Sequence, residues 1–549
     1  MSAPSFEVVG RVVDIEKREA VPSKVRVESG RIVAIESVSE APDTFLLPGF
    51  VDAHVHIESS MLVPTEFARK AVVHGTVATV SDPHEIGNVL GVEGVRYMLA
   101  EAEGSPLKFN FGAPSCVPAT TFETAGAEIT TAEVEALLDD PRVRYLSEMM
   151  NFPGVLHGDP GCLAKIEAAL SRGKPVDGHA PGLRGEEAAR YVAAGMTTDH
   201  ECFTKEEALD KLAAGCKIAI REGSAARNFD ALYTLLSEHP EMTMLCSDDK
   251  HPDELVEGHI DALVRRAVAN GVDAYDVLRA ACVNPVQHYG LDVGLLRVGD
   301  PADFIEVQSL ADFRVKRTWI DGRLVAETGR TKLERVEPPV ANRFVPNRVD
   351  AAQLRVPAAD GLLQVIEALD GQLITNRLSV EPKVEGGAIV SDPSADVLKL
   401  VVVNRYRKAE PAVAFIKNFG LSRGAMASSV AHDSHNVIAV GAEDGDLTEA
   451  INAVMDEGGG LSAVCAAEQT RLVLPLPVAG LMATGTCEEV ADAYQALDRA
   501  VKGWGSPLRA PYMTLSFMAL LVIPELKLSD LGLFDGGRFA FTDLVEGRS

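Results

Sequence analysis

Two histidines one residue apart are the first residues of this 549-residue chain whose types and spacing could do chemistry. His54 and His56 lie near the end of FLLPGFVDAHVHIESSM (45–61), which has the pattern of a buried strand followed by a polar turn. Side chains at i and i+2 of a strand point to the same face, so both imidazoles can reach one ion. The pair therefore predicts half of a metal site whose other ligands come from elsewhere.

Further imidazoles and carboxylates follow apolar segments downstream of this pair. They are Asp82, His84, Glu85, Glu148, His179, His200, Asp248 and Asp249. Imidazole nitrogen combined with carboxylate oxygen suits zinc, manganese or iron rather than calcium or magnesium alone. One histidine at a strand end is more often structural, but a structural interpretation of the whole set needs several separate coincidences. The joint pattern predicts metal binding.

The elements that must position these residues alternate between strand and helix. Helical segments separate the strands, and two more, at 253–270 and 273–283, follow the last one. Apolar strands are expected at 45–57, 76–82, 108–116, 143–151, 174–181, 196–202, 217–225 and 242–249. Eight such units over about 240 residues match an α/β fold of the (β/α)8 TIM-like barrel type, whose active sites lie at the C-terminal strand ends. The polar residues fall at that end.

Segments of different character flank the predicted barrel at 45–290. Residues 1–44 and 291–330 contain short strands with glycine and Asp-Gly turns, and are expected to form a small flanking β-sandwich. Residues 331–360 are charged and contain proline, as in a linker. Residues 361–549 are expected to form a C-terminal α/β domain. Its predicted elements are strands at 397–405, 412–417, 436–441 and 472–477 and helices near 447–457 and 487–501.

Composition narrows the function classes. The formal net charge of −28 disfavours a nucleic-acid partner, because binding to a phosphate backbone rests on a basic surface. The chain lacks a run of about 18 apolar residues and an apolar signal-peptide core, so we expect a cytoplasmic protein without a membrane segment. The 8 cysteines form no CxxC pair, which favours reduced, buried thiols over disulfides or a cysteine-based zinc site.

The chain resembles the metal-dependent amidohydrolase superfamily in its PGFVDAHVH motif and in the later strand-end residues: an acid, two histidines and an aspartate. More narrowly, it resembles the adenine deaminase family in HVHIESSM, SDPHEIGNV, SEMMNFPGV, GHAPGL, TTDHE and AHDSHN. These long motifs extend over nearly the whole chain, the C-terminal domain included. The resemblance implies a hydrolase that converts adenine to hypoxanthine and ammonia in purine salvage, with two divalent ions per chain.

The resemblance also implies roles for individual positions. Glu148 matches the acid that bridges two ions, where many relatives carry a carboxylated lysine. Asp248 is preferred to Asp249 as the strand-8 aspartate, and alternation along the strand should point Asp249 away. The implied metal ligands are His54, His56, Glu148, His179, His200 and Asp248. Manganese is the expected ion, with iron or zinc as alternatives.

The expected mechanism uses a metal-activated hydroxide. Metal-bound water loses a proton near neutral pH, and Asp248 accepts it and later returns it to the amine that leaves C6 of the purine. Single-metal deaminases usually carry a glutamate shortly after the strand-5 histidine, but GHAPGLRGEE lacks the HxxE spacing. That difference favours Glu148 as a bridge in a binuclear centre. The expected catalytic residues are Asp248, Glu148 and Glu85.

Asp82, His84, Glu85 and Ser59 are the candidates for binding the purine, because carboxylate, imidazole and hydroxyl groups can read ring donors and acceptors. For Asp82 and Ser59 the alternative is capping of a turn. The histidines of HDSHN (432–436), His432 and His435, could approach the barrel mouth or bind another ion, or could form a polar interface loop.

Two other functions stay open from the sequence. A different amidohydrolase acting on a cyclic amide or an N-acyl substrate fits the same scaffold, although Glu148 in place of a lysine argues against the cyclic-amide class. A non-catalytic barrel would be expected to lack a ligand, and every expected ligand type is present. Adenine is the expected small-molecule partner, and apolar strands in the tail make a homodimer the expected assembly.

Overall fold

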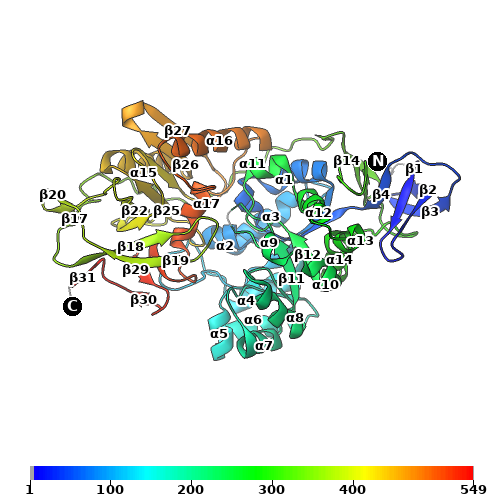
Figure 1. Ribbon diagram of the computed structural model, residues 1–549, viewed down its shortest axis with the longest axis horizontal. Coiled ribbons are helices and arrows are strands. Elements are labelled where there is room, and N and C mark those ends of the chain that lie inside the picture. Colours follow the sequence, from blue (N-terminus) through cyan, green and yellow to red (C-terminus); the bar gives the residue numbers. More distant parts are fainter. Residues whose placement is uncertain (1–4, 225, 548–549) are drawn as a thin grey trace.

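A central barrel carries a β-sheet at one end and a larger β-rich unit at the other (Figure 1). The computed structural model describes residues 5–224 and 226–547. Three expected ranges extend beyond these described residues: 1–44 at its start, 361–549 at its end and the strand 217–225 at its last residue. Within the described ranges, no helix is long and apolar enough to cross a membrane.

The barrel is built from eight strands of the described chain, and neighbouring strands in the sheet run parallel. This confirms the predicted alternation. The strands are β5 (Phe50–Val55), β6 (Thr76–Ser81), β7 (Lys108–Ala113), β8 (Val143–Met149), β9 (Val176–Gly178), β10 (Thr198–Asp199), β11 (Lys217–Arg221) and β12 (Thr243–Cys246). Every residue of β5, β6 and β12 is buried, as expected for parallel strands enclosed by helices.

Helices connect these strands around the barrel, and four more follow the last strand. They are α1 (Pro64–Ala71), α2 (His84–Leu90), α3 (Val92–Ala102), α4 (Thr131–Asp139), α5 (Phe152–His157), α6 (Pro160–Leu170), α7 (Gly185–Ala193), α8 (Lys205–Ala213), α9 (Phe229–Leu232), α10 (Leu235–Glu238), α11 (Pro252–Glu257), α12 (Ile260–Ala269), α13 (Ala274–Leu278) and α14 (Asn284–Tyr289). A capping box begins α4, where the Thr130 hydroxyl accepts from the Glu133 N–H and the Glu133 carboxylate accepts from the Thr130 N–H.

The expected strand 45–57 is in fact two strands. β4 (Phe45–Pro48) pairs with strands of the flanking sheet, and β5 begins the barrel. Gly49 lies between them. No larger residue fits there, because a Cβ at this position would lie 2.2 Å from a methyl carbon of Val77. The dipeptide Pro48-Gly49 was the sequence signal for this break.

The flanking sheet combines segments from before and after the barrel, as predicted. Phe6 of β1 and Trp319 of β14 stack with ring centroids 6.2 Å apart, although two strands of the sheet separate them. The sheet therefore folds back on itself into two layers. Its order in the described chain is β16 (Arg330–Thr331), β15 (Arg323–Glu327), β14 (Val315–Ile320), β13 (Phe304–Val307), β4, β1 (Phe6–Asp14), β2 (Glu19–Glu28) and β3 (Arg31–Ser37).

The C-terminal unit contains more strands than the sequence predicted. The expected strands correspond to β22 (Leu398–Val403), β23 (Ala412–Lys417), β25 (Val437–Gly441) and β27 (Thr470–Pro475), and the expected helices to α15 (Asp444–Glu457) and α16 (Cys487–Gly503). The same sheet also contains β18 (Leu362–Ala368), β19 (Thr375–Val380), β24 (Ala425–Ser428) and β26 (Gly460–Cys465). The small residues of β24, AMAS, have weak strand preference, which explains why this strand was not predicted.

Asp52 closes the barrel between its first and last strands. Its Oδ1 accepts from the Ser247 N–H (2.9 Å), and its Oδ2 accepts from the Ser247 hydroxyl (2.5 Å) and from His259 Nε2 (2.8 Å). Beside this contact the Asp248 N–H donates to the His54 carbonyl (2.9 Å). Asp52 and His259 are both fully buried, so water cannot replace these bonds.

Replacing Asp52 by alanine should lower the free energy of unfolding by about 3 kcal/mol or more, because several buried donors lose their acceptor. Thermal unfolding followed by circular dichroism would measure the loss. Asp43→Ala is the matched control, since the Asp43 side chain is 88% exposed and should matter little. An unfolding midpoint of Asp52→Ala equal to that of Asp43→Ala would contradict the closing role.

Candidate metal centre and active site

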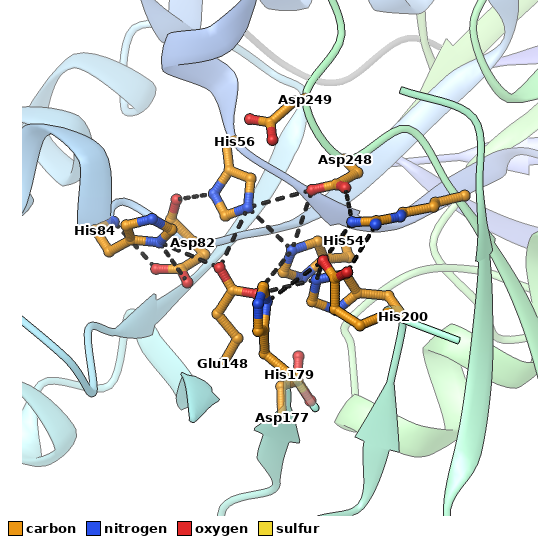
Figure 2. A network of polar contacts seen from close by, with 12 residues as sticks. His54, His56, Asp82, His84, Glu148, Asp177, His179, His200, Asp248 and Asp249 are labelled. Carbon is orange, nitrogen blue, oxygen red and sulfur yellow. Dashed lines mark hydrogen bonds and ion pairs between the residues drawn. The ribbon is translucent and has the colours of Figure 1, made fainter. Parts of the chain in front are cut away.

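The carboxyl ends of the barrel strands bring the six expected metal ligands into one cluster (Figure 2). They are His54 and His56 from β5 and the residue after it, Glu148 from β8, His179 after β9, His200 after β10 and Asp248 after β12. The Nε2 atoms of His54 and His56 are 3.1 Å apart, as their spacing on the strand predicted. They lie 3.7 and 3.4 Å from Asp248 Oδ1.

Glu148 reaches into the middle of this cluster, with His84 on one side and His200 on the other (Figure 2). Its Oε2 lies 2.8 Å from His179 Nδ1 and 3.0 Å from His200 Nε2. Its Oε1 lies 3.5 Å from His56 Nε2. A carboxylate so placed can offer one oxygen to each of two ions.

Burial and mutual contacts set the protonation states of the cluster. Burial, with His200 and His56 nearby, holds the pKa of His54 well below its ordinary value. Burial also favours the neutral acid form of Glu148, but His179 and His200 outweigh it and hold the pKa of Glu148 well below its ordinary value. For His56, His179 and His200 burial lowers the pKa, but the nearby carboxylates outweigh it and hold the pKa above its ordinary value. A metal ion binds the neutral imidazole and the ionised carboxylate, so binding at these three histidines displaces protons.

Arg221 and Glu201 are charged residues at the site that sequence reasoning missed. Arg221 ends β11, one of two barrel strands for which no site residue was predicted, and is 2% exposed. Its guanidinium donates to Asp248 Oδ2 (2.5 Å) and to both oxygens of Glu201 (2.5 and 2.7 Å). Burial opposes ionisation of Asp248, yet Arg221 holds the pKa of Asp248 well below its ordinary value. A charged residue at the end of an apolar strand was the signal available for Arg221.

The loop after β6 presents His84 to the cluster. Asp82 accepts from the His84 backbone N–H at Oδ1 (3.1 Å) and from the ring at Oδ2, 2.9 Å from His84 Nδ1. The same Nδ1 lies 3.5 Å from Glu148 Oε1. Asp82 therefore shapes the turn, as the structural alternative proposed, and at the same time orients the His84 ring beside the cluster.

Asp249 does not point away from the site, so that expectation is wrong. Asp249 Oδ1 accepts from the Ser59 hydroxyl at 2.5 Å, and Asp249 lines the same cavity as Asp248. The reason is the backbone of Asp248, whose φ of 53° lies in the left-handed region. Strand alternation ends there, and both side chains can face the mouth of the barrel.

The C-terminal unit supplies one wall of the site. Glu85 of α2 lies between two imidazoles of the segment 431–436: its Oε1 accepts from His432 Nδ1 (2.5 Å) and its Oε2 from His435 Nε2. The His432 ring also stacks on Phe517, with centroids 4.6 Å apart. Of the alternatives left open by the sequence, approach to the barrel mouth is the one observed.

The cavity between the ligand cluster and this wall is small, about 20 Å³. Such a volume holds about one water molecule. Leu373, Phe517 and Leu520 of the C-terminal unit line it together with the ligands.

The donor set fits divalent metal ions. Overlapping groups of ligand atoms lie within 4.8 Å of one another, for example those of His54, Glu148 and His200 and those of His54, His56 and Asp248. In the described chain, the buried Nε2 of His179 has no hydrogen-bond partner, which costs free energy unless another group satisfies it. Histidine nitrogen with carboxylate oxygen is a combination that zinc, manganese and iron accept.

Two family models match separate regions of the chain. The amidohydrolase family matches residues 45–325, which contain the barrel and all six candidate ligands. The adenine deaminase C-terminal domain matches residues 372–540, which contain the segment 431–436 and Phe517. Both sides of the site thus lie within matched regions.

Curated relatives match over almost the full chain. The adenine deaminase of Salinibacter ruber is 59% identical over 541 residues, which are 98% of this chain and 99% of that protein. Those of a Sulfurovum species and of Methanosarcina acetivorans are 55% and 52% identical, each over 98% of this chain and 99% of the relative. The chain therefore belongs to the adenine deaminase family of the metal-dependent amidohydrolases.

Proposed function

We propose that this protein hydrolyses adenine to hypoxanthine and ammonia. The observation that carries the proposal is the 59% identity, over 98% of the chain, to a protein of that activity by name. The match includes the ligand cluster of the barrel and the wall contributed by the C-terminal unit. Glu148 in place of a lysine supports deamination over the alternative of cyclic-amide hydrolysis.

Two divalent ions per chain are part of this proposal. His54, His56 and Asp248 would hold one ion, His179 and His200 the other, and Glu148 would lie between them. When bound, the ions activate water as Lewis acids. Manganese is the proposed native ion, with iron or zinc as alternatives, because this donor set accepts all three.

Asp248 is the proposed proton carrier. Arg221 fixes its Oδ2 at 2.5 Å, which leaves Oδ1 facing the histidines of β5. As a carboxylate, Oδ1 accepts a proton from the attacking water and then delivers it to the amine that leaves C6. Arg221 keeps Asp248 ionised between turnovers and holds it in one orientation.

The loop after β6 and the turn after β5 are the proposed sides of the base-binding pocket. His84 and Glu85 face the purine ring, with Asp82 orienting the His84 imidazole and the histidines of segment 431–436 fixing Glu85. Ser59 forms the opposite side through its bond to Asp249. Glu85 is also the proposed group that moves a proton at a ring nitrogen.

A cytoplasmic place in purine salvage is proposed with this activity. The proposal rests on the 8 cysteines without a CxxC pair, a pattern that favours reduced thiols. A homodimer stays a prediction, which light scattering coupled to size exclusion would measure.

Purified protein loaded with manganese should release ammonia from adenine with one hypoxanthine formed per ammonia. Ammonia detection together with chromatography of the base would check the ratio. Dihydropyrimidines are the comparison substrates, because a cyclic-amide hydrolase would open them. Hydrolysis of a dihydropyrimidine with no ammonia from adenine would overturn the proposal.

Replacing Glu148 by glutamine should lower both activity and metal content. We expect a fall in kcat of more than about 100-fold, because loss of even a hydrogen-bond partner of a metal ligand typically costs about 10- to 100-fold. Metal analysis by mass spectrometry gives a second readout. Glu101→Gln is the control, since Glu101 is also buried but bonds Thr65 and does not line the cavity. Two ions per chain and full activity in Glu148→Gln would refute the bridging role.

A further inference from the structure

One buried carboxylate at the site has no role in the reaction as described so far. Asp433 belongs to the segment 431–436 of the C-terminal unit, lines the cavity and is 2% exposed. A carboxylate oxygen of Asp433 shares a group of atoms within 4.8 Å with atoms of His84 and Glu85. It therefore lies on the His84 side of the pocket.

Asp433 also differs from the carboxylates of Asp82 and Glu85 in having, within the described chain, an oxygen atom without a hydrogen-bond donor. Its Oδ2 is buried and has no hydrogen-bond partner among the residues that the structure describes. Both oxygens of Asp82 already face His84, and both oxygens of Glu85 face His432 and His435. A buried carboxylate oxygen without a partner costs free energy, so a ligand N–H at this point is favoured.

The segment is held firmly enough to place that oxygen. The Ala431 N–H donates to His435 Nδ1 (3.2 Å), so the other ring nitrogen carries the proton that is donated to Glu85. His432 contacts the second oxygen of Glu85 at 2.5 Å and stacks on Phe517. Asp433 lies between these two anchored histidines in the chain.

The chemistry of adenine leaves few donors for this acceptor. The base has N–H groups only on its 6-amino substituent and on its five-membered ring. The amino group must lie beside Asp248, which shares its group of ligand atoms with His54 and His56. The remaining donor is the ring N–H, the position that carries the sugar in a nucleoside.

We infer that Asp433 accepts the ring N–H of the bound base and thereby selects the free base over its N9-substituted forms. The inference rests on the proposed function. It makes the C-terminal unit the source of substrate specificity, while the barrel supplies the reacting groups. A substituent on the ring nitrogen would meet a buried carboxylate that it cannot satisfy, and sites of this kind reject such analogues strongly.

The test compares adenine with 9-methyladenine as substrates of the wild-type protein and of Asp433→Ala and Asp433→Asn, all loaded with manganese. We expect kcat/KM for adenine to fall roughly 10- to 100-fold in both variants, the cost of losing a charge-assisted hydrogen bond. The ratio of kcat/KM for adenine to that for 9-methyladenine should fall at least tenfold in Asp433→Ala, because the methylated base loses no bond. Isothermal titration with hypoxanthine should show weaker binding at unchanged metal content.

Ser434→Ala is the matched control in the same segment. Its hydroxyl accepts from Asn436 Nδ2 (3.2 Å) and does not line the cavity, so the substrate ratio should stay that of the wild type. If adenine and 9-methyladenine lose activity equally in Asp433→Ala, Asp433 is only structural and the inference fails. If the wild-type protein releases no ammonia from adenine, the proposed function fails, and the inference falls with it.

Discussion

The structure depends on the burial of four imidazoles and two carboxylates close together at one end of the barrel. Such a cluster is costly to bury unless each charge has a partner. Glu148 meets His179 and His200, and Asp248 meets the guanidinium of Arg221. The arginine in turn is neutralised by Glu201 on its other side. These ion pairs offset the free-energy cost of burying the charges, and they also keep the carboxylates in the ionised form that binds metal.

The two residues that close the barrel, Asp52 and Ser247, each lie within two residues of a candidate metal ligand. Asp52 ties β5 to the end of β12, and His54 follows it by two residues while Asp248 follows its partner Ser247 directly. The first and last strands are therefore joined where each delivers a ligand. A fault in closure would move His54 and Asp248 relative to each other, which links the stability of the barrel to the geometry of the site.

The C-terminal unit contributes side chains to the site in addition to covering it. It contributes His432 and Asp433 to the cavity beside the barrel ligands, His435 contacts Glu85, and Phe517 packs against His432. Glu85 of the barrel contacts both His432 and His435 of this unit, so one carboxylate joins the two units at the site.

Local sequence pattern by itself determined the eight-strand alternation and the ligand types, because period-two alternation and strand-end polarity are properties of neighbouring residues. The family resemblance, rather than the pattern, implied His54, His56, Glu148, His179, His200 and Asp248 as the ligand set. Only the tertiary structure decided the contacts between distant segments, such as Glu85 with His435, 350 residues later. It also decided local geometry that packing imposes, such as the left-handed backbone of Asp248 that turns Asp249 toward the mouth. The sequence pattern shows the periodicity of apolar residues within each element. It does not show how far apart two elements lie in space, and that distance decides which buried charges become partners.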